Sequence, residues 1–236
     1  MMFMNDKMIE TLLDEAERHL IGSDVAHDLL HLKRVMRNAV YIAEREGADL
    51  EVVIPAAIFH DIVTYRKDDE RSRHAQADSA KLASIVLRKL GFPQEKVEKI
   101  TYTIEVCSFT KGIVPTTIEA KVVQDADMLE AVGAIAIMRT FASNGAMRKP
   151  FYDENDPFCE RRKPEPNRYA LDLFPQRLLV IKDRVHTRTA KKIVEKRTRF
   201  LNLFMGELRQ DLELCDGDGA VKTGKQVGVF AQKVRG

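Results

Sequence analysis

The chain has 236 residues, 44% of them hydrophobic and 31% charged, a composition typical of a globular protein with an apolar core. Because 38 Lys and Arg stand against 36 Asp and Glu, the formal net charge of +2 excludes nucleic-acid binding driven by overall charge, although not a local basic pocket. No apolar segment approaches the roughly 18 residues of a membrane-spanning helix. Residues 1–10 lack the apolar core of a secretion signal, and the three cysteines are widely spaced. We therefore expect a cytoplasmic protein with no membrane contact and no disulfide framework.

Hydrophobic residues recur with a helical period along almost the whole chain, and no pair of strands is indicated. The pattern predicts helices over residues 5–20, about 25–46, about 50–63, about 74–90, 94–107, about 117–143, about 168–185 and 187–214. Ser23 or Asp24 is placed to cap the second helix, Gly47 to end it in a left-handed conformation, and Asp49 to cap the third.

Two segments lack a helical pattern. Residues 146–167 contain four prolines and predict a long polar loop, a feature that is usually functional when it is ordered. Residues 215–236 hold five of the twelve glycines and predict a flexible tail. The expected fold is therefore all-α, with a single domain over residues 1–214 and a Gly-rich flexible tail over 215–236.

A polar pair interrupts the third predicted helix. His60 and Asp61 follow a stretch in which seven of nine residues are apolar. Because an unpaired carboxylate is costly to bury, Asp61 needs a cation, a set of hydrogen-bond donors or a metal ion. The alternative is a helix end at which both side chains reach water and Asp61 meets an Arg or Lys.

Asp125 and Asp127 interrupt a second apolar segment in the same way. Residues two apart face different sides of a helix, so we expect one to bind metal and the other to meet a basic side chain or cap a neighbouring helix. A surface ridge of acidic residues is the alternative, and the apolar neighbours disfavour it.

His27 and His31 share one helix face, and His31 falls close to the apolar stripe, so it is the one expected to point inward. A solvated pair of histidines is the alternative. Arg34 lies on the same side as His31, where it can meet a phosphate or pair with an acid.

The order His31, His60-Asp61, Asp127 resembles the HD superfamily of metal-dependent phosphohydrolases. Residues 27–35 resemble the first motif of that family, with the ligand at His31 rather than His27, and residues 59–62 and 124–131 resemble the central and last motifs. The resemblance covers about residues 20–212 and implies an HD-type helical bundle. It also implies one divalent metal ion held by His31, His60, Asp61 and Asp127, with Asp61 as a catalytic residue.

Residues 133–135, 139–141 and Gly145 resemble a bacterial single-domain branch that includes nucleotide pyrophosphatases. The implied function is hydrolysis of nucleoside or deoxynucleoside triphosphates to monophosphate and pyrophosphate by a metal-activated water. Two imidazoles and two carboxylates suit Mn²⁺, Mg²⁺, Fe²⁺, Co²⁺ or Zn²⁺, of which Mn²⁺ or Mg²⁺ is expected. The candidates for binding substrate phosphates are Lys33, Arg34 and Lys67.

Three residues depart from the family pattern and leave alternatives open. Thr64 stands where some relatives carry an acidic residue, Met128 where an Arg is common, and Cys107 where close relatives often have His. The absence of that His argues against a second metal. The alternatives are a nucleotide-binding sensor with little turnover and a phosphohydrolase that acts on another phosphoester. A homo-oligomer is compatible with the sequence. The basic stretch from Arg184 to Arg199 is expected to be a solvated face or a phosphate-facing wall, and nucleic-acid binding is a poor third.

Overall fold

The computed structural model describes residues 4–20, 28–65, 69–109 and 112–213, and these residues form helices and no strand. The α-helices are α1 (Asp6–His19), α2 (Leu29–Glu46), α3 (Leu50–Phe59), α4 (Ala75–Lys89), α5 (Gln94–Glu105), α6 (Ile118–Met128), α7 (Ala134–Ala146) and α8 (Arg188–Glu213). The short helices are η1 (Glu70–His74), η3 (Leu129–Ala131), η4 (Phe174–Leu178) and η5 (Ile181–Asp183). The all-α prediction is confirmed. None of these helices combines the length and apolar character needed to cross a membrane.

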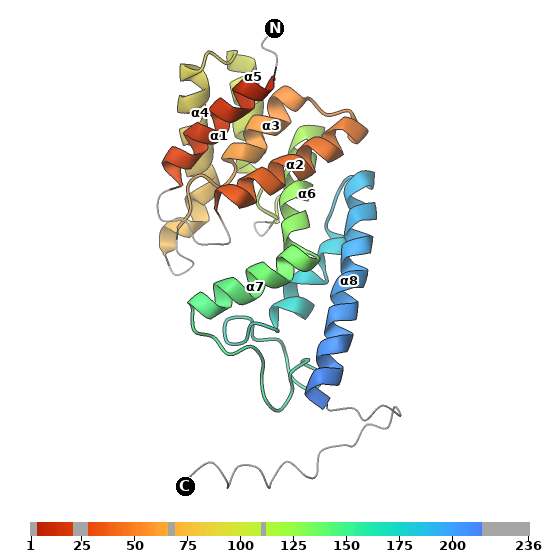
Figure 1. Cartoon of the computed structure of the whole chain (residues 1–236). Helices are drawn as coiled ribbons and strands as arrows, with labels where there is room; N and C mark the ends of the chain where they lie inside the picture. Colours follow the sequence, from red (N-terminus) through yellow and green to blue (C-terminus); the bar gives the residue numbers. More distant parts are fainter. Residues whose placement is uncertain (1–3, 21–27, 66–68, 110–111, 214–236) are drawn as a thin grey trace.

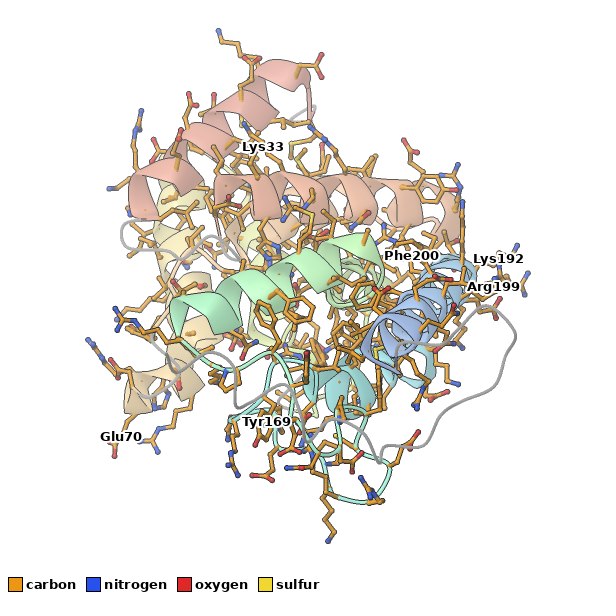
Figure 2. All side chains as sticks on the ribbon, turned by 60° about the horizontal axis from the view of Figure 1, so that its bottom comes forward. Lys33, Glu70, Tyr169, Lys192, Arg199 and Phe200 are labelled. Atoms are coloured by element: carbon orange, nitrogen blue, oxygen red, sulfur yellow. The ribbon has the colours of Figure 1, made fainter. Side chains whose placement is uncertain are left out.

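The helices form two layers joined by α6 (Figure 1). Helices α1 to α5 pack together in the upper part, where α2 lies against α3 and α6, and α4 lies against α5. Helix α6 runs downward out of this bundle into the lower part, which contains α7, α8 and the segment between them. Exposed charged side chains such as Glu70, Lys192 and Arg199 lie at the periphery of both layers (Figure 2).

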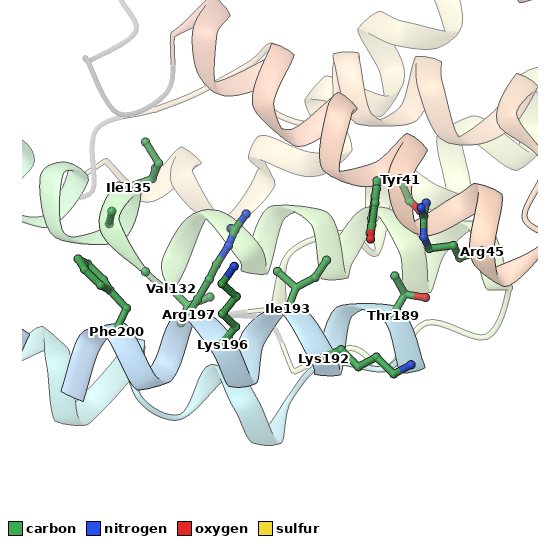
Figure 3. A pocket seen from close by; sticks show the side chains of 12 residues that line it. Tyr41, Arg45, Val132, Ile135, Thr189, Lys192, Ile193, Lys196, Arg197 and Phe200 are labelled. Atoms are coloured by element: carbon green, nitrogen blue, oxygen red, sulfur yellow. The ribbon is translucent and has the colours of Figure 1, made fainter. Parts of the chain in front are cut away.

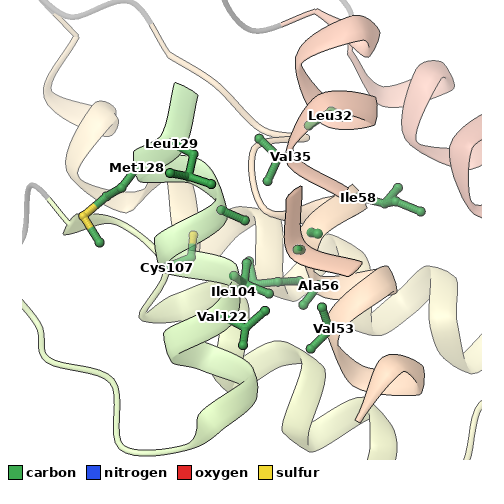
Figure 4. Packing of buried hydrophobic residues seen from close by; sticks show 14 of the residues in the cluster. Leu32, Val35, Val53, Ala56, Ile58, Ile104, Cys107, Val122, Met128 and Leu129 are labelled. Carbon is green, nitrogen blue, oxygen red and sulfur yellow. The ribbon is translucent and has the colours of Figure 1, made fainter. Parts of the chain in front are cut away.

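Helix α3 is the centre of the upper layer because it is apolar on every side. Its residues from Val52 to Phe59 are all buried, and they pack on side chains from α2, α5 and α6 (Figure 4). Gly47 ends α2 with a φ of 72°, and Asp49 caps α3 by accepting from the N–H of Glu51 at 3.0 Å, both as predicted. The helix ends at Phe59, four residues earlier than predicted, so that His60 and Asp61 follow its last turn.

The start of α2 lies at Leu29, where Asp28 caps the helix by accepting from the N–H of His31 at 2.8 Å. Ser23 and Asp24, the predicted caps, lie outside the described residues, as does the predicted tail over 215–236.

The single helix predicted over residues 117–143 is wrong. Helix α6 ends at Met128, and Gly133 separates it from α7 with a φ of 87°, a conformation that favours glycine. A Cβ atom on Gly133 would lie 3.1 Å from side-chain carbons of Arg197 on α8. The close approach of α8 and the left-handed backbone therefore both require glycine at this break, while the apolar residues on either side continue a helical period.

The helix predicted over residues 168–185 is also wrong, because turns and the short helices η4 and η5 replace it. Asp172, fully buried, accepts hydrogen bonds from Arg162 at 2.5 and 2.8 Å and from the N–H of Glu165 at 2.6 Å. Pro175 lacks a backbone donor, which disfavours a regular helix through this point. The predicted loop over 146–167 is confirmed, and the ion pair between Arg162 and Asp172 joins this loop to the turn that follows it.

Candidate metal centre

The four predicted metal ligands come together from three helices. His31 lies in the first turn of α2, His60 and Asp61 follow α3, and Asp127 lies in the last turn of α6. The Nε2 atom of His60 is 3.6 Å from Asp61 Oδ2 and 3.8 Å from Asp127 Oδ1, and the Nε2 atom of His31 is 3.9 and 3.8 Å from the same two oxygens. Two atoms bound to one ion at about 2.1 Å lie roughly 3 to 4 Å apart. The donor atoms of His31, His60 and Asp127 all lie within 4.8 Å of one another and suit a single divalent ion, and Asp61 lies beside the two imidazoles.

The ring of His60 is fixed in the orientation that a metal ligand needs. Its Nδ1–H donates to the carbonyl of Ala57 at 2.8 Å, which leaves the lone pair on Nε2. That Nε2 atom is buried and has no hydrogen-bond partner among the described residues. A buried polar atom without a hydrogen bond is costly, and a metal ion supplies the missing partner.

His31 is held by a buried carboxylate. Its Nδ1 lies 3.4 Å from Oε2 of Glu130, which is 2% exposed, and the same oxygen accepts from Nε of Arg34 at 2.7 Å. Such carboxylate–histidine pairs orient metal-binding imidazoles and raise their basicity. Glu130 therefore supports the centre without being one of its ligands.

The electrostatics of the site favour a cation. Burial alone would lower the pKa of His60, but Asp61 and Asp127 outweigh burial and raise that pKa above its usual value. Burial also opposes the charged form of Asp127, yet His60, His31 and Arg139 together hold its pKa below the usual range. The carboxylate of Asp127 is thus ionised and places negative charge beside the imidazole nitrogens.

Asp125 has a structural role. Its carboxylate accepts from the backbone N–H groups of His186 and Thr187, each at 2.8 Å, and from the Thr187 hydroxyl at 2.7 Å. These donors precede the first residue of α8, so Asp125 fixes the start of that helix. Thr187 in turn accepts from the N–H of Ala190 in the first turn of α8 at 3.2 Å, so Asp125 holds the residue that caps this helix and does not cap it directly.

The predicted substrate-binding residues are dispersed. Arg34 donates to Glu130, so of the two roles expected for it, binding a phosphate or pairing with an acid, the structure shows the pair with an acid. Lys33 is two residues from His31 on α2, and two residues correspond to a rotation of about 200°, so it projects away from the ligand side of the helix (Figure 2). Lys67 and His27 lie outside the described residues.

Two other arginines lie close to the ligands. Arg139 of α7 donates to the carbonyl of Glu130 at 3.4 Å, and its charge acts on His31 and Asp127. Arg177 of η4 packs over the ring of Phe109 at 5.0 Å; burial lowers its pKa, and the charge of Asp127 opposes this shift. The sequence indicated Arg139 only as part of residues 139–141, which resemble one branch of the family. It gave no indication of a functional role for Arg177, because Arg177 falls in a segment predicted to be an ordinary helix.

The residues that depart from the family pattern have clear positions. Met128 and Cys107 are buried in the apolar core, and Thr64 is exposed. His186 faces away from the ligands, with Nε2 at 2.6 Å from Oε1 of Gln124, and His74 is exposed. No second cluster of metal-binding side chains is found in the described ranges.

Comparison with known proteins agrees with this centre. The HD domain family matches residues 29–132, a range that includes all four ligands. The Bacillus subtilis (strain 168) protein YpgQ is 31% identical over 216 residues, which cover 90% of this chain and 97% of YpgQ. The chain belongs to the HD superfamily. As an HD-superfamily protein with these ligands, it is a metal-dependent phosphohydrolase.

Solved structures of other HD proteins share the fold. The crystal structure of Bacillus subtilis YpgQ in complex with ADP superposes with a TM-score of 0.67 at 30% identity, covering 87% of this chain and 95% of that one. An HD-superfamily hydrolase from Bacillus thuringiensis superposes with a TM-score of 0.68 at 29% identity, covering 87% of this chain and 96% of that one. The likeness therefore extends beyond the HD domain into α7 and α8.

Proposed function

We propose that this HD protein hydrolyses nucleoside or deoxynucleoside triphosphates to the monophosphate and pyrophosphate. The observation that carries the proposal is the metal-binding cluster of His31, His60 and Asp127, whose Asp127 interacts electrostatically with two arginines of the lower layer, Arg139 and Arg177. The YpgQ structure with ADP supports a nucleotide as the ligand class. In this reaction a water oxygen bonds to the α-phosphorus, the bridging α–β P–O bond breaks, and pyrophosphate leaves with the bond electrons.

The side chains would divide the work as follows. His31, His60, Asp61 and Asp127 would hold a divalent ion, for which we favour Mn²⁺ or Mg²⁺. When bound, such an ion lowers the pKa of a coordinated water and draws charge from a phosphoryl oxygen. Asp61, whose side chain is 17% exposed, would accept a proton from the attacking water.

Arg139 and Arg177 would bind the phosphates beyond the one attacked. Burial makes the charged form of Arg177 costly, and an anionic partner offsets that cost. Arg34, which donates to Glu130 at 2.7 Å, would act through that residue and stays a candidate for phosphate binding. Lys33 and Lys67 stay candidates for binding substrate phosphates; no contact among the described residues supports this role for Lys33, and Lys67 lies outside those residues.

Product analysis tests this function directly. The protein is stripped of metal, loaded with Mn²⁺ or Mg²⁺, and incubated with mixed NTPs and dNTPs, and the products are read by mass spectrometry. We expect monophosphate and pyrophosphate in equal amounts, with no product from the Asp61→Asn variant. Release of inorganic phosphate would replace the reaction by another phosphoester hydrolysis, and intact nucleotides with metal bound would favour the sensor alternative.

A further inference from the structure

A groove with a cavity volume of about 790 Å³ lies outside the metal centre, between α2, the start of α7 and α8 (Figure 3). Its volume falls within the range of roughly 300 to 1,000 Å³ found for small-molecule sites. The described residues that line it include four cations and no acid; the cations are Arg45, Lys192, Lys196 and Arg197.

The two lysines are the cations available to a ligand. Both are exposed, and neither forms an ion pair with an acid in the described part of the chain. Arg197 donates to the carbonyl of Leu129 at 2.5 Å, and Arg45 stacks over the ring of Tyr41 at 3.5 Å. Glu46 accepts from the N–H of Thr189 at 2.8 Å and interacts with the charge of Lys192, and Glu44 lies 3.8 Å from Arg45. The four cations of the lining outnumber these two acids, so the groove keeps an excess of positive charge.

The backbone at one end of the groove adds to this charge. Gly133, Ala134 and Ile135 line the groove and begin α7, a helix of 13 residues with no side-chain cap at its N-terminus. The first N–H groups of a helix lack intrahelical acceptors and attract anions. The groove therefore combines lysine ammonium groups with backbone donors, a pairing suited to phosphate.

The rest of the lining is apolar. Phe200 and Tyr41, each 46% exposed, lie at opposite ends of the groove; Ile135 lies beside Phe200, and Ile193 lies between the two rings (Figure 3). Aromatic side chains do not stabilise an inorganic anion, whereas a nucleotide base can stack on them. The lining thus matches a ligand with a phosphate part and a flat apolar part.

The groove is separate from the metal centre. Tyr41 is ten residues beyond His31 on α2, which corresponds to about 15 Å along the helix axis. None of the four metal ligands, nor Arg139 or Arg177, is among the described residues that line it. We propose that this groove is a second nucleotide site, which holds phosphates on Lys192, Lys196 and the start of α7 and a base against Phe200, and which needs no metal.

Binding to metal-free protein tests this proposal independently of the proposed function. The Asp61→Asn variant in excess chelator is titrated with ADP and with tripolyphosphate by calorimetry. We expect ADP to bind, and replacement of both Lys192 and Lys196 by Ala to weaken binding of both probes about tenfold or more. Phe200→Ala should weaken binding of ADP but not of tripolyphosphate. Lys191→Ala is the matched control, because Lys191 is exposed on α8 outside the groove lining.

Three results would overturn the proposal. The first is ADP binding that is absent from the metal-free protein or that the double lysine variant leaves unchanged. The second is tripolyphosphate binding equal to that of ADP and indifferent to Phe200→Ala, which would remove the base from the assignment. The third is an effect of the lysine changes on self-association in light scattering instead of on ligand binding, which would assign the groove to contact between copies of the chain.

Discussion

At the scale of single residues, Glu130 is the side chain that connects the candidate ligand His31 to Arg34. It is buried, and one of its oxygens contacts both His31 and Arg34. Glu130→Gln removes the charge while keeping the size, so His31 loses its orienting carboxylate. We expect metal affinity to fall about 10- to 100-fold, measured by titrating the metal-free protein.

The control for this change is Glu98→Gln, which alters an exposed residue of α5. It should leave metal affinity unchanged. A Glu130→Gln protein that folds normally and binds metal as tightly as the parent would remove Glu130 from the support of the centre.

Arg177 is the residue whose replacement best separates substrate binding from metal binding. Its charge is only partly offset by Asp127, and burial lowers its pKa. If it binds a phosphate, Arg177→Met should lower kcat/KM for nucleotide hydrolysis by about tenfold to a hundredfold, the effect of losing one charged hydrogen bond. Metal affinity should stay the same. Arg37→Met, an exposed position on α2, is the matched control, and equal losses in both variants would contradict the assignment.

At the scale of the helices, two acids on α6 provide a matched pair. Asp125 holds the start of α8 through three hydrogen bonds, whereas Asp127 points to the metal centre. Asp125→Asn should lower the free energy of unfolding by about 2 kcal/mol and leave metal retention intact. Asp127→Asn should abolish metal retention with little loss of stability in chelator. Urea unfolding and metal analysis of both proteins decide the matter, and the reverse pattern would exchange their roles.

The segment between α7 and α8 depends on one buried ion pair. Burial alone would raise the pKa of Asp172, but hydrogen bonds from Arg162 and from the N–H of Glu165 outweigh it and hold that pKa below its usual value. Arg162→Ala leaves the carboxylate buried without its partner and should cost about 3 kcal/mol at neutral pH.

The same pair predicts an acid dependence. A carboxyl whose pKa is lower in the folded state stabilises the fold above its unfolded pKa of about 3.9 and loses this contribution as pH falls below that value. Melting temperatures of the parent and Arg162→Ala proteins should therefore differ most above about pH 5 and converge toward pH 3. A difference that is constant from pH 3 to 8 would show that the pair contributes packing and not charge.

At the scale of the whole molecule, a metal ion at the candidate centre would join α2, the end of α3 and α6, which come from different parts of the chain. An ion that binds only the folded state at 100 times its dissociation constant adds about 2.7 kcal/mol, which raises the melting temperature of a protein of this size by roughly 5 to 10 °C. We expect this shift on adding Mn²⁺ to the metal-free protein, measured by scanning calorimetry. The Asp61→Asn protein serves as the control, and a similar shift in that variant would place the stabilising metal elsewhere.

The upper layer was predictable from sequence because its signals are local. Apolar periodicity, Gly47 and Asp49 define α2 and α3, and a costly polar pair at the end of an apolar helix marks His60 and Asp61. The convergence of the ligands required the family resemblance, since periodicity does not say which helix ends meet.

In the lower layer, α8 and the long loop were predictable, but the break at Gly133 and the segment around Asp172 were not, because contacts outside the local pattern decide them. The break at Gly133 accommodates Arg197, which is 64 residues further on, and the turn around Asp172 is set by Arg162. In both segments the local pattern remains helical, and a side chain from elsewhere determines the backbone. Arg177 could not be assigned to the centre for the same reason.

The break at Gly133 also separates two groups of functional candidates along the chain. All four candidate metal ligands precede it, whereas Arg139, Arg177 and the basic face of α8 follow it. Under the proposed function, substitutions in the second segment would change which substrate is bound and leave the candidate metal ligands unchanged. Descendants of such a protein would then acquire new substrates one substitution at a time and keep the metal throughout.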